Sequence, residues 1–287
     1  MIAKNVIFLK TDDKEKIALW KISNSEKNII DNIFLTHGTF SNKHICLGIA
    51  NYFAKQGYCC YILEWRNHGK SRPTRTRFNF ETIASYDINT VFTYLFEDLK
   101  LKSVHCITHS GGGIALSMFL MKHTIYNHKI NSITMFACQA FGAATLRKNK
   151  IKILLSKYLT LLIGYIPAKK LRLGPHNESY YTMKQWFDWN LKKKFCSTDK
   201  KFDYRIHMVN VQIPIYSISS KGDTFIAPSI GCKMFLESFG NSENIFKVYS
   251  RENGNLENYD HSKIIMSRNS AQEIWPSVLK WIEKNKT

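Results

Sequence analysis

The sequence has few acidic residues and no apolar run long enough to span a membrane. Lys and Arg number 41 against only 22 Asp and Glu, which gives a formal net charge of +19. A transmembrane helix needs about 20 consecutive apolar residues, and the absence of such a run argues against one. Internal repeats and low-complexity tracts are also missing, which argues against a solenoid or a disordered chain. The 287 residues, 44% of them hydrophobic, suffice for one α/β domain with a substantial core.

The patterns that indicate metal sites or disulfide frameworks are missing too. The chain has no H-E-x-x-H and no paired C-x-x-C, and His105 and His109 bracket a predicted strand instead of one helix face. We therefore predict no metal and no cofactor. The seven cysteines are an odd number and lie mostly in apolar segments, as buried free thiols do, which favours a reducing compartment. The apolar run at the N-terminus is too short for a signal peptide, so we expect a cytoplasmic protein.

One serine stands on a glycine-rich turn between an apolar strand and an apolar helix. Residues 103–109 predict a buried strand, and residues 114–121 predict a helix packed against it. Ser110 lies at their junction and is followed by three glycines. A turn of this kind strains the backbone and directs the free N–H groups of the helix N-terminus toward developing negative charge. The segment therefore predicts a nucleophile at Ser110.

Other predicted strands end in polar residues that suit the same chemistry. The strand at 33–36 runs into His-Gly-Thr-Phe at 37–40, and the strand at 58–65 runs into a polar turn. Asp223 comes shortly after the predicted strand 211–218, and His261 lies in the loop behind the predicted strand 244–250. The chain thus presents serine, aspartate and histidine in that order.

These motifs resemble those of the α/β-hydrolase superfamily, in its lipase, esterase and thioesterase branch, over nearly the whole chain. Residues 37–40 resemble the family's oxyanion loop, 65–71 its W-R-G-H-G-x-S turn, 108–112 its nucleophile elbow, and 222–223 its acid loop. The order Ser, Asp, His is also the family's order. The chain departs from the pattern at Thr108, where glycine is usual, and in the length of the interval between acid and histidine.

The resemblance implies an α/β fold with a mostly parallel central sheet, helices on both faces, and a helical cap inserted before the acid-bearing strand. Residues 1–140 and 206–287 would form the α/β-hydrolase core. Residues 141–205 would form the cap, which carries both the strongest basic excess and the most apolar helix, predicted over 151–166.

The implied activity is that of a serine hydrolase that cleaves a carboxylic ester or thioester of a small-to-medium acyl substrate through an acyl-enzyme. His261 would take the serine proton, since a base with a pKa near ~6.5 suits neutral pH. Asp223 would hold the histidine in one tautomer. The backbone N–H groups of Gly111 and Thr39 would form the oxyanion hole. The sequence leaves open whether Thr39 or Phe40 supplies the second donor.

Other histidines compete for the role of the base. His37, His68 and His109 lie in motif positions that the family uses for loop architecture, and His261 alone of these four follows the last strand.

Other aspartates compete for the role of the acid. Asp87 falls within an amphipathic helix predicted over 80–99, and Asp260 adjoins the histidine itself, so Asp223 is preferred. Dehalogenase or epoxide hydrolase chemistry would require an aspartate at position 110 and is not expected.

Two other functions fit the same residues. An acyltransferase would use the same triad and hand the acyl group to an alcohol or amine in place of water. A non-catalytic protein of the same fold would bind an anionic membrane or an acidic carrier through its basic cap.

The charge of the predicted cap admits three interpretations. Between Thr145 and Arg205 there are fifteen Lys or Arg and four Asp or Glu, a local balance of +11. The lysines could be a solvated face while the leucines pack on the core. They could steer an acyl substrate carried on an acidic headgroup or carrier protein, whose chain fills an apolar lining. They could also dock a basic amphipathic helix on an anionic membrane. No nucleic-acid-binding motif accompanies the charge, so we expect no nucleic acid.

Overall fold

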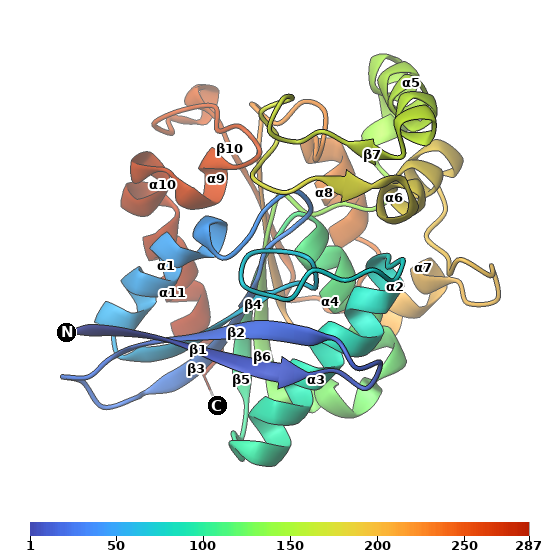
Figure 1. Ribbon diagram of the computed structural model, residues 1–287. Helices are drawn as coiled ribbons and strands as arrows, with labels where there is room; N and C mark the ends of the chain where they lie inside the picture. The colour runs from blue at the N-terminus through green and yellow to red at the C-terminus, as the bar shows by residue number, and fades with distance from the viewer. Residues whose placement is uncertain (287) are drawn as a thin grey trace.

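An eight-stranded sheet forms the centre of the molecule, in the order β1-β2-β4-β3-β5-β6-β9-β10 (Figure 1). The computed structural model describes residues 1–286. The strands are β1 (Ile2–Lys10), β2 (Lys16–Asn24), β3 (Asp31–Thr36), β4 (Tyr58–Glu64), β5 (Val104–His109), β6 (Ile130–Phe136), β9 (Ile215–Ser220) and β10 (Ile245–Tyr249). The six strands from β4 to β10 run parallel, whereas β1 and β2 form an antiparallel hairpin at one edge.

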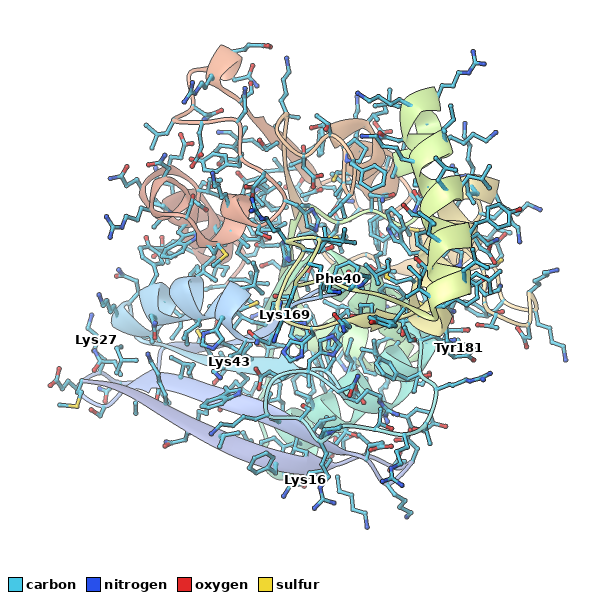
Figure 2. All side chains as sticks on the ribbon, turned by 45° about the horizontal axis from the view of Figure 1, so that its top comes forward. Lys16, Lys27, Phe40, Lys43, Lys169 and Tyr181 are labelled. Carbon is cyan, nitrogen blue, oxygen red and sulfur yellow. The ribbon has the colours of Figure 1, made fainter. Side chains whose placement is uncertain are left out.

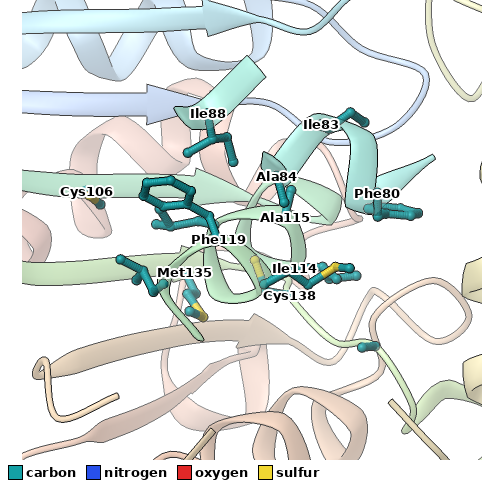
Figure 3. Close-up of a cluster of buried hydrophobic side chains, with 14 of the residues drawn as sticks. Phe80, Ile83, Ala84, Ile88, Cys106, Ile114, Ala115, Phe119, Met135 and Cys138 are labelled. Carbon is teal, nitrogen blue, oxygen red and sulfur yellow. The ribbon is translucent and has the colours of Figure 1, made fainter. Parts of the chain in front are cut away.

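Helices cover both faces of this sheet. Alternate residues of β3 point to opposite faces, so Ile33 and Leu35 join the core under α1 (His44–Lys55) and α11 (Trp275–Lys284). Phe34 joins the core on the other face, together with residues of α3 (Asn89–Thr93) and α4 (Gly111–Lys122). Figure 3 shows part of this second core, where Phe119 and Ile114 of α4 lie near Ile88 and Cys138. The predicted α/β architecture is therefore confirmed.

Two predicted helices differ from the structure. The segment 80–99 is not one α-helix, because π-helical turns η1 (Ile83–Ile88) and η2 (Tyr94–Asp98) alternate with α2 (Phe80–Thr82) and α3. The predicted helix over 271–284 divides into α10 (Arg268–Glu273) and α11. Pro276 stands at the start of α11, and proline cannot donate the backbone hydrogen bond that would continue the preceding helix.

The segment 141–205 contributes no strand to the central sheet. It contains α5 (Arg147–Ile163), β7 (Tyr165–Ile166), β8 (Glu178–Ser179) and α6 (Tyr180–Lys192), and β7 and β8 form a small sheet of their own. α5 packs along α6, where Lys157 Nζ lies 2.6 Å from Asp188 Oδ1. The helix ends at Gly164, whose φ of 85° is the left-handed conformation that terminates helices at glycine. Compared with the predicted helix over 151–166, α5 begins four residues earlier and ends before Pro167.

Shorter elements connect these parts. They are η3 (Thr124–Lys129), η4 (Ala143–Thr145), α7 (Tyr204–His207), η5 (Met208–Asn210), α8 (Ser229–Leu236), η6 (Arg251–Asn253) and α9 (Lys263–Met266). None of the helices formed by residues 1–286 combines the length and the hydrophobicity needed to cross a membrane.

Candidate active site

Ser110 occupies a sharp turn between β5 and α4, as its sequence context predicts. Its φ of 53° and ψ of −125° lie in a region that non-glycine residues rarely adopt, and such strain is typical of functional sites. The Ser110 N–H donates to the carbonyl of Phe136 (2.9 Å), which ties the turn to β6. The serine is 8% exposed at the N-terminus of α4.

The glycines after the serine explain how the turn accommodates Thr108. A Cβ added at Gly113 would lie 2.9 Å from Thr108 Oγ1 and would overlap Cys138 Sγ. A Cβ added at Gly112 would lie 2.6 Å from the carbonyl oxygen of His37. Thr108 is fully buried, and its hydroxyl also approaches the Thr134 carbonyl (3.4 Å). Gly113 therefore leaves free the space that the Thr108 side chain occupies, so position 108 does not have to be glycine.

The structure brings Ser110, His261 and Asp223 together in one hydrogen-bonded chain. His261 Nε2 lies 2.8 Å from Ser110 Oγ, and His261 Nδ1 lies 2.5 Å from Asp223 Oδ2. The three residues come from separate segments, namely the β5–α4 turn, the loop after β9 and the loop after β10. A serine within hydrogen-bonding reach of a histidine that a carboxylate orients is an arrangement that can activate a nucleophile.

Asp223 is held as a carboxylate in an almost fully buried position. Its Oδ1 accepts hydrogen bonds from the backbone N–H groups of Ile226 and Ala227, each at 3.1 Å. Burial alone would raise the pKa of Asp223, but the charge of His261 and these hydrogen bonds hold it below its usual value. The group is therefore ionised at neutral pH and can orient the Nδ1–H of His261.

His109 contacts His261 through the backbone carbonyl of that residue. Its Nε2 lies 2.7 Å from the His261 carbonyl oxygen, and the two rings lie 4.8 Å apart. A carbonyl oxygen only accepts hydrogen bonds, so Nε2 of His109 carries the proton. Burial and the nearby His261 lower the pKa of His109 to about 3, which keeps this ring neutral.

The loop at 38–40 lies directly against the serine turn. A Cβ added at Gly38 would lie 2.7 Å from Ser110 Cβ and 2.8 Å from the Gly111 nitrogen. Thr39, Phe40 and Gly111 all line the cavity that contains Ser110. The N–H of Phe40, however, already donates to Glu178 Oε1 (3.1 Å). The geometry therefore favours Thr39 over Phe40 as the second N–H donor beside the serine.

The other motif histidines support the surrounding loops. His37 accepts from the Trp65 N–H through Nε2 (3.2 Å), and burial, followed by the charge of His68, lowers its pKa well below the usual value. His68 Nε2 lies 3.0 Å from Glu178 Oε1. Burial lowers the pKa of His68, but Glu178 more than offsets this and raises it. Glu178 was not predicted to be functional, although it is an isolated acidic residue in a segment rich in lysine and arginine.

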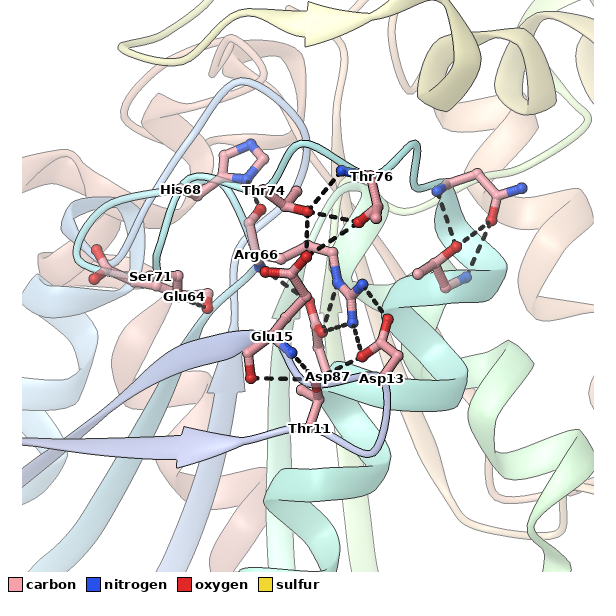
Figure 4. A network of polar contacts seen from close by, with 12 residues as sticks. Thr11, Asp13, Glu15, Glu64, Arg66, His68, Ser71, Thr74, Thr76 and Asp87 are labelled. Carbon is pink, nitrogen blue, oxygen red and sulfur yellow. Dashed lines mark hydrogen bonds and ion pairs between the residues drawn. The ribbon is translucent and has the colours of Figure 1, made fainter.

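The two alternative aspartates lie away from the serine. Asp87 forms a buried network with Arg66, whose Nη2 lies 2.8 Å from Asp87 Oδ1 and whose Nη1 lies 2.6 Å from Asp13 Oδ2 (Figure 4). This network joins the β1–β2 turn, the turn after β4 and η1. Asp260 is exposed, and its Oδ1 accepts from the N–H groups of Ser262 and Lys263 at the start of α9. His261 contacts neither carboxylate among its hydrogen bonds.

An apolar cavity of about 470 Å³ opens beside Ser110, between the core and the 141–205 segment. We call it the large cavity, to distinguish it from a smaller one beside His261. Its size lies within the usual range for small-molecule sites. In the view of Figure 2, Phe40 and Lys169 lie near the centre and α5 stands at the edge. The cavity is lined by Thr39, Phe40, Phe80, Ser110, Gly111, Ser156, Leu159, Thr160, Ile163, Tyr165, Ile166, Pro167, Leu171, Leu173, Met183, Trp186, Phe187, Phe225 and Ile226.

A second cavity of about 240 Å³ lies on the His261 side. Thr39 and Phe40 line both cavities, so the serine–histidine pair stands between them. The second cavity is more polar and includes Ser41, Asn42, His44 and Ser262. Within residues 1–286, no group of three or more His, Cys, Asp or Glu side chains is arranged to hold a metal ion.

Comparison with known proteins supports the fold. A family model described as the alpha/beta hydrolase fold matches residues 31–145. No curated protein sequence matches the chain significantly. An esterase from Exiguobacterium antarcticum is similar at 15% identity and a TM-score of 0.66, over 96% of this chain and 98% of that one. Mouse alpha/beta hydrolase domain-containing protein 10 is similar at 12% identity and a TM-score of 0.69, over 98% and 100%.

The Pyrococcus furiosus esterase Pf2001 is a third similar structure, at 14% identity and a TM-score of 0.67, over 100% of this chain and 92% of that one. Identities this low speak for the fold alone. The resemblance to the α/β-hydrolase superfamily is thus confirmed, and the chain has the α/β-hydrolase fold.

Proposed function

We propose that this protein is a serine hydrolase that cleaves a carboxylic ester or thioester with a small-to-medium acyl chain. The observation that carries the proposal is the hydrogen-bonded chain from Ser110 Oγ through His261 to Asp223, at a strained turn beside an apolar cavity. The esterases among the similar structures are consistent with it.

In the first half of the reaction, Ser110 Oγ attacks the acyl carbonyl while His261 Nε2 takes the serine proton. The Nδ1–H of His261 stays bonded to Asp223, which stabilises the imidazolium without taking its proton. The N–H groups of Gly111 and Thr39 face the developing oxyanion, and one such donor typically contributes about 3 kcal/mol of barrier lowering. When the intermediate collapses, His261 returns its proton to the leaving alkoxide or thiolate.

In the second half, water attacks the acyl-Ser110 ester and His261 takes a proton from that water. The second intermediate collapses to the free acid, and the proton returns to Ser110 Oγ. The large cavity would hold the acyl chain because its wall is almost wholly apolar. The second cavity would hold the leaving group, since it lies beside the His261 that protonates that group.

The same acyl-enzyme could pass its acyl group to an alcohol in place of water. The second cavity is mostly apolar but more polar than the large one, and it favours this as the second candidate, because Ser41, Asn42 and Ser262 could position an acceptor hydroxyl beside His261. Adding glycerol or ethanol to an ester assay and measuring the transfer product separates the two activities.

The test is hydrolysis of p-nitrophenyl esters from acetyl to palmitoyl. Each buried methylene contributes about 0.8 kcal/mol, so kcat/KM should rise about fourfold per methylene until the large cavity is full. Ser110→Ala should lower kcat by at least roughly 10⁴-fold. Ser117→Ala is the matched control, because Ser117 is buried in the helix that follows Ser110 and its hydroxyl donates to the Gly113 carbonyl (2.7 Å). Equal activity in wild type and Ser110→Ala would reject the proposal, as would a complete lack of turnover together with no labelling by serine-directed probes.

A further inference from the structure

The outer side of α5 exposes an apolar stripe to solvent. Ile151, Leu155, Tyr158 and Leu162 recur at helical spacing, with exposures of 53%, 58%, 57% and 83%. The residues that α5 buries, such as Ile153, lie on the opposite side of the helix. Figures 1 and 2 both show α5 at the edge of the molecule. A helix normally carries polar residues on its solvent-facing side, so this exposed apolar stripe indicates that another surface binds to it.

Further apolar side chains extend this surface along α5 and into the loop that follows it. We call the whole set the α5 face. Besides the stripe, its exposed members are Leu146, Leu154, Leu159, Leu161, Ile163, Tyr165, Leu171 and Leu173.

The α5 face comes from a strongly basic stretch of the sequence. From Leu146 to Asn177 the sequence has eight Lys or Arg and no Asp or Glu. They are Arg147, Lys148, Lys150, Lys152, Lys157, Lys169, Lys170 and Arg172. Within residues 1–286, Lys157 alone of these eight forms an ion pair, with Asp188. The others are exposed, at the N-terminal end of α5 and on the loop after β7.

The α5 face also borders the large cavity. Leu159, Ile163 and Leu171 are each more than half exposed, and each also lines the cavity that contains Ser110. A surface that covers the α5 face would therefore lie beside the cavity that contains Ser110.

We propose that the α5 face docks on an anionic phospholipid bilayer. The apolar stripe would enter the boundary between headgroups and acyl chains, and the exposed cations would bind anionic headgroups, as interfacial helices do. Docking does not depend on the proposed hydrolysis. Delivery of an acyl chain from the membrane past Leu159, Ile163 and Leu171 to Ser110 does rest on the proposed hydrolysis.

Charge argues against a second copy of this chain as the occupant. A symmetric contact through the α5 face would bring two sets of unpaired cations together, and like charges that face each other across an interface are strongly unfavourable. A soluble acidic protein could match the charge, but the stripe itself is convex, because it lies on the outer side of a helix at the edge of the molecule. A bilayer accepts a convex apolar helix directly.

Vesicle sedimentation tests the proposal, with phosphatidylcholine vesicles compared with vesicles containing 30% phosphatidylglycerol. We expect binding to the anionic vesicles to be at least about tenfold tighter and to weaken in 0.5 M NaCl. Leu155→Glu/Leu162→Glu should weaken it at least about tenfold. Ile125→Glu/Ile206→Glu is the matched control, because these side chains are 66% and 68% exposed elsewhere and the charge change is the same. Its binding should stay within about twofold of wild type.

Two further measurements separate docking from catalysis and from self-association. Neither Leu155 nor Leu162 lines the large cavity, so the double variant should hydrolyse soluble p-nitrophenyl acetate at the wild-type rate. Ser110→Ala should bind vesicles as the wild type does. Equal vesicle binding by Leu155→Glu/Leu162→Glu and its control would overturn the proposal. So would a wild-type dimer in light scattering that this variant dissociates without any vesicle binding, or binding of a soluble acyl carrier protein alone.

Discussion

Replacing His109 with phenylalanine would test whether this neighbour of the nucleophile positions His261. The substitution keeps a ring of similar size against His261 but removes the Nε2–H that donates to the His261 carbonyl at 2.7 Å. The ring is neutral in the wild type because its pKa is about 3, lowered by burial and by His261. The substitution therefore removes a hydrogen bond without removing a charge.

The expected magnitude follows from the lost hydrogen bond. A buried carbonyl left without a donor costs about 1–3 kcal/mol. If His261 shifts to recover that loss, kcat should fall about 5- to 150-fold, at 1.36 kcal/mol per factor of ten. The KM should change less than kcat, because His109 lines the second cavity but not the large cavity that would hold the acyl chain. The shape of the pH–rate profile above about pH 5 should also be unchanged, since His109 does not titrate there.

The assay is steady-state hydrolysis of p-nitrophenyl butyrate, measured beside urea unfolding of each variant. His105→Phe is the matched control, because His105 is fully buried in the same strand and its Nδ1 lies 2.8 Å from Ser132 Oγ. This control should lose comparable stability and keep kcat within about twofold. If His109→Phe loses only stability and retains full kcat, His109 is structural and the positioning argument is refuted.

Three further changes have definite expectations. Asp223→Asn should lower kcat by roughly 10⁴-fold in the p-nitrophenyl butyrate assay, because the amide would favour the wrong tautomer of the base; a loss below tenfold would contradict its role. Gly113→Ala should cost about 1–3 kcal/mol in urea unfolding through overlap with Cys138, and Cys138→Ala should recover at least half of that cost if the contact is correct. Glu178 raises the pKa of buried His68, so their pairing contributes fully below about pH 6.5 and is lost as pH rises through the raised value; the stability lost in Glu178→Gln should therefore be larger at pH 6 than at pH 8.5, and an equal loss would refute this coupling.

The sequence predicts most of the central fold because its parallel strands are buried on both faces. Such strands appear as continuous apolar runs, and the runs ending at His109 and Glu64 correspond to β5 and β4. The π-turns within 80–99 could not be predicted, because over one or two turns an apolar pattern does not distinguish i→i+5 from i→i+4 hydrogen bonding. The predicted strand from 211 begins only at Ile215, after Pro214, because proline cannot donate to the sheet.

The order of the polar residues at the strand ends predicts the candidate catalytic residues more completely than the residues that hold their loops in place. The sequence predicts Ser110, Asp223 and His261, and the structure places His261 within hydrogen-bonding distance of both other residues. The contact of Glu178 with the Phe40 N–H could not be predicted, because 138 residues separate them and no pattern links the two segments. The choice between Thr39 and Phe40 depends on that contact and therefore on backbone geometry.

The shape of the 141–205 segment is the least predictable part. The sequence shows that this segment is rich in leucine and lysine, but the α-helical pattern does not indicate which side of α5 contacts the core. The structure shows that a narrow set around Ile153 is buried while Leu162 is 83% exposed. Of the three interpretations of this segment, the one in which its leucines pack on the core is therefore wrong for Leu155 and Leu162.

The most direct test of the central claim is covalent labelling of the nucleophile. The protein would be treated with diethyl p-nitrophenyl phosphate and analysed by intact mass spectrometry and peptide mapping. The account predicts one diethylphosphoryl group per chain, located on Ser110, absent from Ser110→Ala and retained in Ser117→Ala, with esterase activity lost in step with labelling. Hydrolysis that continues with Ser110 unlabelled, or full labelling of another residue with loss of activity, would contradict it.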